Sequence, residues 1–286
     1  MLLNAHSQIV SNGESMPFDI EDDSRYDCTC GKYLDECNFF RSAAGHMWND
    51  RIREWDRSVF VHVPKLSRIA ILNSFLTSWR FESKFRNFLI RTNPTYRVIQ
   101  DRFLNAQLLY FANARNLKGS SIYMDGTKSL RRAQLFANNS SRTGHTYLMK
   151  VLHIIRDGRG FCYSYLKNER SKPTLSQAAR TWLRYIEQVD TFSKRFPAIP
   201  ILTVRYEDLC RSTAETVGSI CRFFEINYED LRIDATIQTH ILGHEMRKTF
   251  TGIVKEDTIW REALTREDQK NMILLMGEML KRFGYI

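Results

Sequence analysis

Apolar residues recur at helical spacing over a long stretch in the first half of the chain. Between about residues 66 and 116 this spacing favours helices, with a break at Pro94, because proline cannot donate the hydrogen bond that a helix interior needs. We interpret residues 51–118 as a helical insert.

Short apolar runs alternate with helical patterns through the rest of the chain. Continuous runs of this kind suit strands of a parallel sheet that is buried on both faces. With helices between them, they predict an α/β class, a three-layer α/β/α arrangement with a mostly parallel central sheet. Ligands of such sheets bind beyond the carboxyl ends of the strands. The predicted strands are Gln8–Ser11, Ser121–Asp125, Val151–Ile155 and Ile199–Arg205.

Helix starts are marked by hydroxyl residues. Thr174 with Gln177 forms a capping box, Ser212 with Glu215 resembles one, and Thr265 opens the last helix, which we expect to end at Gly284. With 286 residues, of which 43% are hydrophobic, the chain can bury one sizeable core, so we expect a single domain over residues 1–286.

Residues 15–50 are polar and rich in turns, and we expect them to form an excursion on the surface. They contain Cys28, Cys30 and Cys37, with His46 as the sole nearby candidate for a fourth metal ligand. A loop-closing disulfide or free thiols are therefore favoured over zinc, and we predict no metal site. The other three cysteines lie in predicted helices and are expected to be free thiols: Cys162, Cys210 and Cys221.

The net charge of +10 and the pI of about 9.4 predict that the protein attracts anions. The basic residues are scattered, without a run of like charge, so nucleic acid is disfavoured as a partner. No apolar window of about 18 residues predicts a membrane span, and no targeting signal is recognisable. We therefore expect a cytoplasmic location.

The strongest chemical signal follows the strand Val151–Ile155. The strand delivers Arg156 to its carboxyl end, Asp157 and Gly158 turn the chain into a helix, and Ser164 follows eight residues after Arg156. A guanidinium offers two donors to phosphate oxygens, and a hydroxyl and a helix amino end add further donors. Taken alone, an arginine at a strand end is more often part of a surface ion pair.

This pattern resembles sulfotransferases that use 3'-phosphoadenosine-5'-phosphosulfate (PAPS), in which such an arginine and serine bind the 3'-phosphate. The Cys28–Phe40 segment is similar to a Cys-x-Cys-Gly stretch of one bacterial-type branch, which is related to tyrosylprotein sulfotransferases. The family has a P-loop-like fold. Further similar segments, in the order of the family, are Leu3–Glu14, Asp125–Lys128, Arg205–Leu209, His240–Arg247, Trp260 and Phe283–Tyr285.

The resemblance also implies roles for individual residues. Glu14 is the implied catalytic base, with Asp125 as the rival, and Lys128 neutralises charge that develops on the sulfate. In the structural alternatives, Glu14 is a helix cap or a loop carboxylate that faces water, and Asp125 with Lys128 forms a helix cap and an ion pair. Tyr206 approaches the adenine and Arg247 closes over the 3'-phosphate, although His244 replaces the expected asparagine. The acids of Arg205–Leu209 are expected to cap the next helix.

The loop that holds the 5'-phosphosulfate in this family has no counterpart before Leu2, and we expect Met1 to be an internal or misassigned start. A rival register places that loop at Pro64 and Lys65, but Leu66 and Ile69 occupy positions where the family has hydroxyl residues or glycine. In the alternative interpretation, Val59–Val63 and Ile69–Phe75 are apolar residues that pack within the helical insert, and Lys65 is solvated.

We therefore expect a sulfotransferase that moves a sulfuryl group from PAPS to a hydroxyl of a carbohydrate, lipid or protein tyrosine, with an anionic glycan favoured by the charge. The alternative is a non-catalytic relative that binds only adenosine bisphosphate. A P-loop kinase is disfavoured because no Gly-x-x-x-x-Gly-Lys-(Ser/Thr) motif occurs.

Overall fold

The computed structural model describes residues 2–14, 27–34, 36–45, 66–77, 84–139, 147–169, 172–231, 240–243, 248 and 253–286. The chain divides into two compact units. Unit 1 consists of Met1–Tyr147 and Leu231–Gly252, and unit 2 of Leu148–Asp230 and Ile253–Ile286. The single domain over residues 1–286 stays a prediction, and each unit is described by itself.

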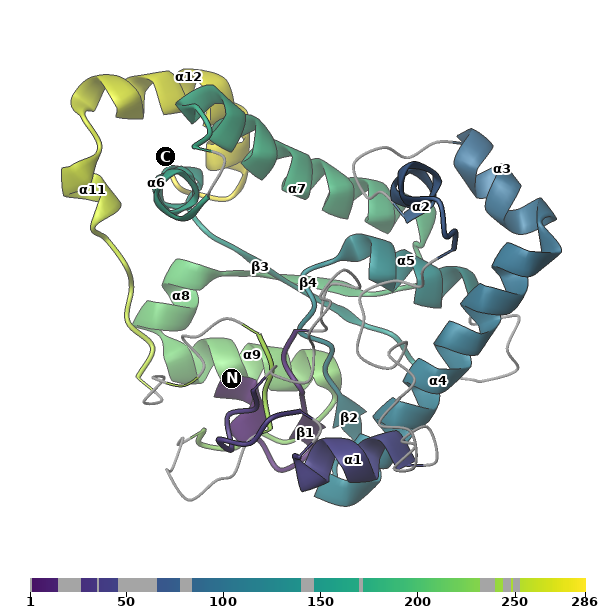
Figure 1. The fold of residues 1–286 in the computed structure, drawn as a ribbon. Coiled ribbons are helices and arrows are strands. Elements are labelled where there is room, and N and C mark those ends of the chain that lie inside the picture. The colour runs from purple at the N-terminus through teal and green to yellow at the C-terminus, as the bar shows by residue number, and fades with distance from the viewer. Residues whose placement is uncertain are drawn as a thin grey trace. The chain divides into compact units, whose positions relative to one another are not determined.

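Unit 1 is built around two short parallel strands and a long helix (Figure 1). In the strand pair, Ile9 lies opposite Ile122 and Val10 opposite Tyr123, as the sequence predicted for parallel strands. The elements of unit 1 are a 3-10 turn η1 (Leu2–Ala5), β1 (Ile9–Val10), α1 (Asn38–Ala44), α2 (Ala70–Thr77), α3 (Lys84–Thr92), α4 (Pro94–Lys118), β2 (Ile122–Tyr123) and α5 (Leu130–Asn139).

The core of unit 1 contains the cysteine segment. Cys28, Cys37 and Phe40 are at most 1% exposed and pack with Tyr110 of α4 and with Leu242. The prediction that this segment lies on the surface is therefore wrong for its buried apolar residues, although Gly31, Lys32 and Tyr33 are exposed. Its apolar side chains are separated by polar residues, and this mixture made a buried segment look like a loop.

The predicted helical insert contains α2, α3 and α4. Pro94 does not merely break the helical pattern but occupies the first turn of α4, where Asn93 caps the helix by accepting from the amides of Thr95 and Tyr96. Leu66 packs with Leu76 and Ile90 in a small apolar cluster.

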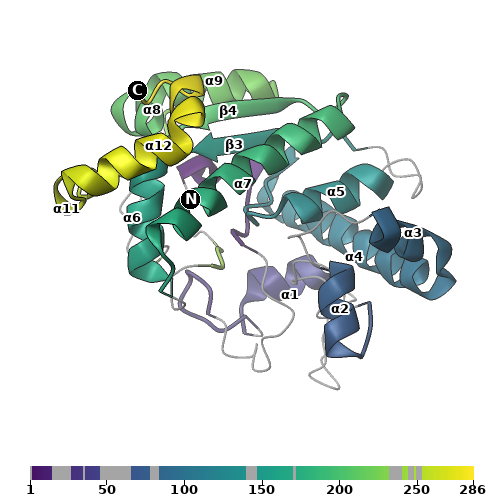
Figure 2. The same cartoon turned by 90° about the horizontal axis from the view of Figure 1, so that it is seen from above.

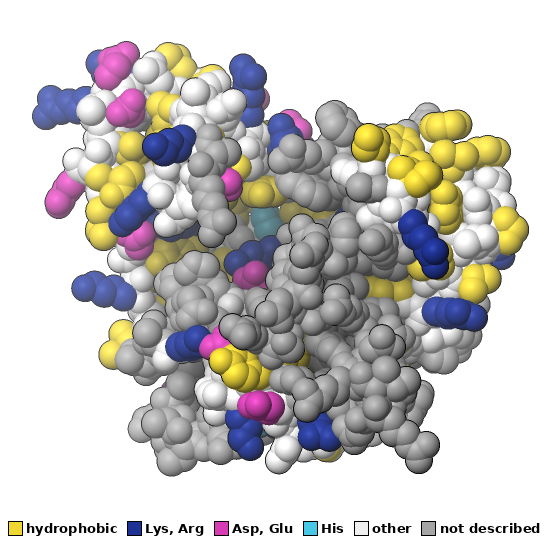
Figure 3. All heavy atoms as spheres, viewed as in Figure 1, with side chains coloured by type: hydrophobic (Ala, Val, Ile, Leu, Met, Phe, Trp, Pro, Cys, Tyr) yellow, Lys and Arg dark blue, Asp and Glu magenta, His cyan; other side chains and the backbone are white. Residues whose placement is uncertain are grey.

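Other apolar side chains of α2 and α3 are exposed. Ile71, Phe85 and Phe88 are 84%, 63% and 61% exposed. Figure 3 shows apolar side chains gathered at the surface over these helices. The expected packing of Ile69–Phe75 within the insert is therefore wrong for Ile69 and Ile71, which are 64% and 84% exposed. Pro64 and Lys65, on which the rival register depends, lie outside the described residues.

Unit 2 is built on a second parallel pair, whose register runs from Val151 opposite Ile201 to Ile155 opposite Arg205. Figures 1 and 2 show α7 and α9 on opposite sides of this pair. The elements are β3 (Val151–Ile155), α6 (Gly158–Asn168), α7 (Leu175–Arg195), β4 (Ile201–Arg205), α8 (Tyr206–Arg211), α9 (Thr213–Phe224), α11 (Trp260–Ala263) and α12 (Arg266–Arg282).

Helices and small parallel sheets fit the predicted α/β class, whereas a P-loop-like three-layer architecture for the chain stays a prediction. In unit 2 the core lies between α6, α7 and α12, and it includes Ile155, Trp182 and Met276. This packing holds the carboxyl end of β3 against α7. The strand is not buried throughout, because Ile154 is 50% exposed.

The local signals for helix starts are confirmed at two of three places. Thr174 and Thr265 each cap their helix in a full capping box, with Gln177 and Asp268 as the reciprocal partners. Ser212 makes no side-chain cap, because it forms the junction between α8 and α9 and its own amide donates to the carbonyl of Asp208. Among the described helices, none combines the length and apolar character that a membrane crossing requires.

Candidate active site

The chain leaves β3 through a turn that is fixed by hydrogen bonds. The Nε1 atom of Trp182 donates to the carbonyl of Arg156 over 3.1 Å. Asp157 caps α6, accepting from the amide of Arg159, and its carboxylate also binds the Arg159 guanidinium at 2.7 Å. Arg156 is thereby held at the carboxyl end of the strand, as the sequence predicted.

Glu207 secures the same turn from α8. Its carboxylate is 5% exposed, accepts from the amide of Asp157 over 2.9 Å and accepts from the Tyr285 hydroxyl over 3.0 Å. The expectation that Glu207 caps the following helix is therefore wrong. A buried carboxylate is stable only with such partners, so Glu207 is a positioning residue for the start of α6.

The Arg156 side chain lies over the Tyr206 ring, with 5.3 Å from the guanidinium carbon to the ring centre. Its Nη2 atom donates to the carbonyl and the carboxylate of Asp257 over 3.1 and 3.0 Å. Burial acts to raise the pKa of Asp257, but the hydrogen bond and charge of Arg156 hold this pKa below its ordinary value. Within the described residues, Nε and Nη1 of Arg156 have no hydrogen-bond partner.

Ser164 lies on the face of α6 that Arg156 covers. A Cβ atom on Gly160 would be 3.1 Å from Nε of Arg156, so the side chain passes closely over this glycine. Ser164 follows one helical turn later on the same face, since residues i and i+4 of a helix are neighbours. Its hydroxyl, which is half-buried, accepts from Nδ2 of Asn168 over 3.3 Å. The structure therefore places both predicted phosphate ligands on one side of α6.

We expect that replacing Gly160 with alanine will weaken any anion site at Arg156. The new Cβ would lie 2.9 Å from the Trp260 ring and displace both it and the guanidinium. Overpacking of this kind lowers the free energy of unfolding by about 1–3 kcal/mol, which should lower the melting temperature. A cost of this size should also lower the nucleotide affinity measured by calorimetry by at least roughly fivefold. Gly277→Ala in α12 is the matched control because its Cβ meets nothing closer than 3.9 Å. Equal nucleotide affinities for the two variants would contradict this account.

Tyr206 is at the end of β4, as predicted, but its hydroxyl is already engaged. It donates to the carbonyl of Lys255 over 2.8 Å and accepts from the amide of Asp257 over 3.2 Å. Burial raises the pKa of Tyr206. An adenine contact of Tyr206 stays a prediction, and Arg247 and His244 lie outside the described residues.

In unit 1 the predicted catalytic residues Glu14 and Lys128 form an ion pair at 2.7 Å. The Glu14 amide donates to the carbonyl of Leu242, and Gly13 before it has a φ of +76° that favours glycine. Lys128 is 80% exposed. The expected ion pair between Lys128 and Asp125 is therefore wrong, because the lysine pairs with Glu14 instead.

Asp125 has a different role from Glu14. It accepts from Nε of Arg132 over 2.5 Å and from the amide of Thr127 over 2.9 Å, and Arg132 also donates to Gln107. Burial acts to raise the pKa of Asp125, but the charge and hydrogen bond of Arg132 keep this pKa below its ordinary value. A carboxylate held in this way is a weak base. Glu14 is also ion-paired, but its partner Lys128 is 80% exposed whereas Arg132 is buried, so Glu14 is the better candidate of the two.

Three residues around Arg156 in unit 2 were missed or misassigned from the sequence: Asp257, Glu207 and Gly160. Asp257 contacts Arg156 across 101 positions of chain, a separation at which no spacing rule operates. Gly160 could have been suspected, because a glycine inside a predicted helix costs stability and usually has a packing reason.

Residues 149–230 match a family model described as Sulfotransferase family. The matched region contains Arg156, Ser164, Tyr206 and Glu207, and thus most of the site in unit 2. No curated protein and no solved structure matches the chain. The match supports a relationship between this region of the chain and the sulfotransferases, which are transferases.

Proposed function

We propose that this protein is a PAPS-dependent sulfotransferase that transfers a sulfuryl group to a hydroxyl acceptor. The observation that carries the proposal is the Arg156 guanidinium at the carboxyl end of β3, which lies over the Gly160–Ser164 face of α6 within the family-matched region. This is the combination that the resemblance assigns to the 3'-phosphate.

The local chemistry suits a phosphate. Arg156 has donors at Nε and Nη1 that bind nothing within the described residues, and Ser164 adds a hydroxyl donor. A glycine at position 160 lets the guanidinium approach the helix closely. A phosphate there would compete with Asp257 for Nη2, since both are anions.

The proposed reaction is an in-line displacement at sulfur. The acceptor hydroxyl oxygen forms a bond to the sulfur, and the bond from sulfur to the bridging phosphate oxygen breaks, so that adenosine 3',5'-bisphosphate leaves with the electron pair. Glu14 takes the proton of the acceptor hydroxyl. Lys128 provides positive charge for the oxygens on which negative charge develops.

Carbohydrate, lipid and protein tyrosine hydroxyls all satisfy this chemistry. The net charge of +10 favours anionic acceptors because it raises their local concentration at low ionic strength. An anionic glycan is therefore the first acceptor to try, and its rate should fall as salt is added.

The direct test is transfer of radiolabelled sulfate from PAPS to a panel of sulfated glycans, simple phenols and tyrosine peptides. We expect labelled product from at least one class, with release of an equal amount of adenosine bisphosphate. If the chain binds the bisphosphate but labels no acceptor in the panel, the non-catalytic binding protein becomes the better description.

A further inference from the structure

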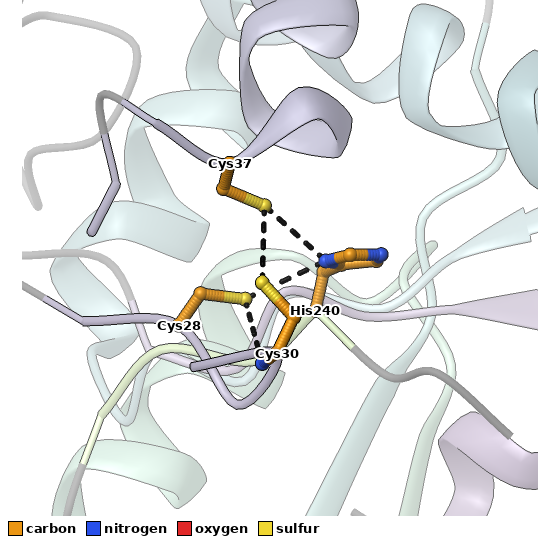
Figure 4. A group of neighbouring side chains, drawn as sticks. All are labelled: Cys28, Cys30, Cys37 and His240. Carbon is orange, nitrogen blue, oxygen red and sulfur yellow. Dashed lines mark hydrogen bonds between the residues drawn. The ribbon is translucent and has the colours of Figure 1, made fainter. Parts of the chain in front are cut away.

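Three cysteines and one histidine of unit 1 converge on a single point (Figure 4). Cys28, Cys30, Cys37 and His240 each offer one ligand atom, and these four atoms lie within 4.8 Å of one another. Nδ1 of His240 is 3.3 Å from Sγ of Cys37 and 3.5 Å from Sγ of Cys28. Sγ of Cys30 is 3.7 Å from Sγ of Cys37.

Three of the six separations among the four ligand atoms fit the edges of a metal tetrahedron. Zinc bonds are about 2.3 Å to sulfur and about 2.0–2.1 Å to nitrogen, so a regular tetrahedron sets sulfur atoms about 3.8 Å apart and sulfur and nitrogen about 3.6 Å apart. The three measured distances lie within roughly 0.3 Å of these values. A disulfide requires about 2.05 Å between sulfur atoms, well below the Cys30–Cys37 separation.

Hydrogen bonding alone explains the cluster poorly. The Nδ1 atom of His240 has one lone pair or one proton, yet two sulfur atoms lie in contact with it. Thiols are weak donors and weak acceptors, so they gain little from facing one another in a core. One ion at the centre would satisfy all four ligand atoms together.

The backbone around the cysteines is shaped for ligation. The Cys28 amide donates to the carbonyl of Lys32, the Gly31 amide donates to the carbonyl of Cys28, and the Cys30 amide donates to Sγ of Cys28 over 3.4 Å. This tight turn needs the φ of +82° at Gly31, where a side chain would be strained.

His240 is held in place from three sides. Its carbonyl accepts from the side chain of Asn12 over 3.0 Å, and its ring stacks on Phe39 with the ring centres 4.7 Å apart. The next residue, Ile241, donates its amide to the Thr29 hydroxyl over 3.0 Å. The histidine is therefore preorganised beside the cysteine turn, 203 positions along the chain from Cys37.

We infer that Cys28, Cys30, Cys37 and His240 form a structural zinc site. Four protein ligands close the coordination sphere, as in structural rather than catalytic zinc sites, and thiolate with imidazole selects zinc over magnesium or calcium. This inference replaces our expectation of no metal, which considered only His46 as the fourth ligand. His46 lies outside the described residues.

The site would connect the cysteine segment to the strand-like segment 240–242. Leu242 pairs with Gly13 in a parallel bridge, donates its amide to Asn12 and accepts from the amide of Glu14. A metal at His240 would thus stabilise the backbone that carries Glu14, without contact with the reacting groups. The inference does not depend on the proposed sulfotransferase activity.

The test is the metal content of the full chain purified without chelators, measured by inductively coupled plasma mass spectrometry. We expect about one zinc per chain, lost in Cys28→Ser and His240→Ala but retained in Cys210→Ser, which removes a thiol outside the cluster. Cobalt exchanged into the wild-type chain should give the intense visible bands of a tetrahedral thiolate site.

The wild-type measurements decide the question even if the variants fail to fold. Absence of stoichiometric metal, together with a cobalt spectrum typical of the aqueous ion, would overturn the inference. So would a disulfide mapped by peptide mass spectrometry between two of Cys28, Cys30 and Cys37, because it would leave too few thiolates for the site.

Discussion

Replacing Arg156 with alanine should weaken binding of adenosine 3',5'-bisphosphate by at least about 100-fold. Hydrogen bonds to charged groups contribute about 1.5–3 kcal/mol each, and the guanidinium has two donors that bind nothing within the described residues. Since 1.4 kcal/mol corresponds to a factor of ten, losing both hydrogen bonds should lower the affinity by at least about 100-fold. Isothermal titration calorimetry of the two proteins measures it.

Two control variants separate lost contacts from lost charge. Arg156→Lys keeps the charge but not the planar fork, so its affinity should fall between those of the wild type and Arg156→Ala. Arg282→Ala removes an equal charge elsewhere in unit 2, where Arg282 pairs with Asp190 on the surface. If Arg282→Ala weakened binding as much as Arg156→Ala, the effect would be one of net charge, and the proposed site would be wrong.

The second large effect concerns the two candidate bases. Glu14→Gln should lower the rate of sulfuryl transfer by about 10²–10⁴, the usual contribution of a general base, while leaving bisphosphate affinity unchanged. The substitution keeps the shape of the side chain and removes its ability to accept the proton. The measurement is kcat for the acceptor found in the labelling test, alongside calorimetry.

Asp125→Asn provides the contrast. It removes the carboxylate charge that pairs with the buried Arg132, so it should lower the free energy of unfolding by about 1.5–3 kcal/mol. For a protein of this size that corresponds to roughly 4–10 °C in melting temperature. A folded Asp125→Asn with kcat reduced as strongly as in Glu14→Gln would argue for Asp125 as the base instead.

The parts of this fold that were predictable have local causes. Four strands appear where continuous apolar runs predicted them, and the capping boxes at Thr174 and Thr265 depend on residues three apart. The position of Arg156 also follows locally, because it is the first residue after β3. The predicted cap at Ser212 was wrong because another helix, α8, ends where this cap would form.

The parts that were not predictable depend on contacts between distant residues. His240 joins Cys37 across 203 positions, Asp257 joins Arg156 across 101, and the partner of Lys128 is Glu14 rather than the nearby Asp125. Periodicity and spacing describe neighbours within an element, so they cannot select such partners. Burial of the cysteine segment was missed for the same reason, since its apolar residues become a core only when α4 and Leu242 pack on them.

The nucleotide site at Arg156 is tested by calorimetric titration of the 286-residue chain with adenosine 3',5'-bisphosphate, compared with adenosine 5'-monophosphate as the ligand that lacks the 3'-phosphate. We expect micromolar binding of the bisphosphate, with the monophosphate at least about tenfold weaker because Arg156 and Ser164 would lose their anion. Equal affinity for the two ligands, or no binding of the bisphosphate, would contradict the assignment of this site to the sulfate donor.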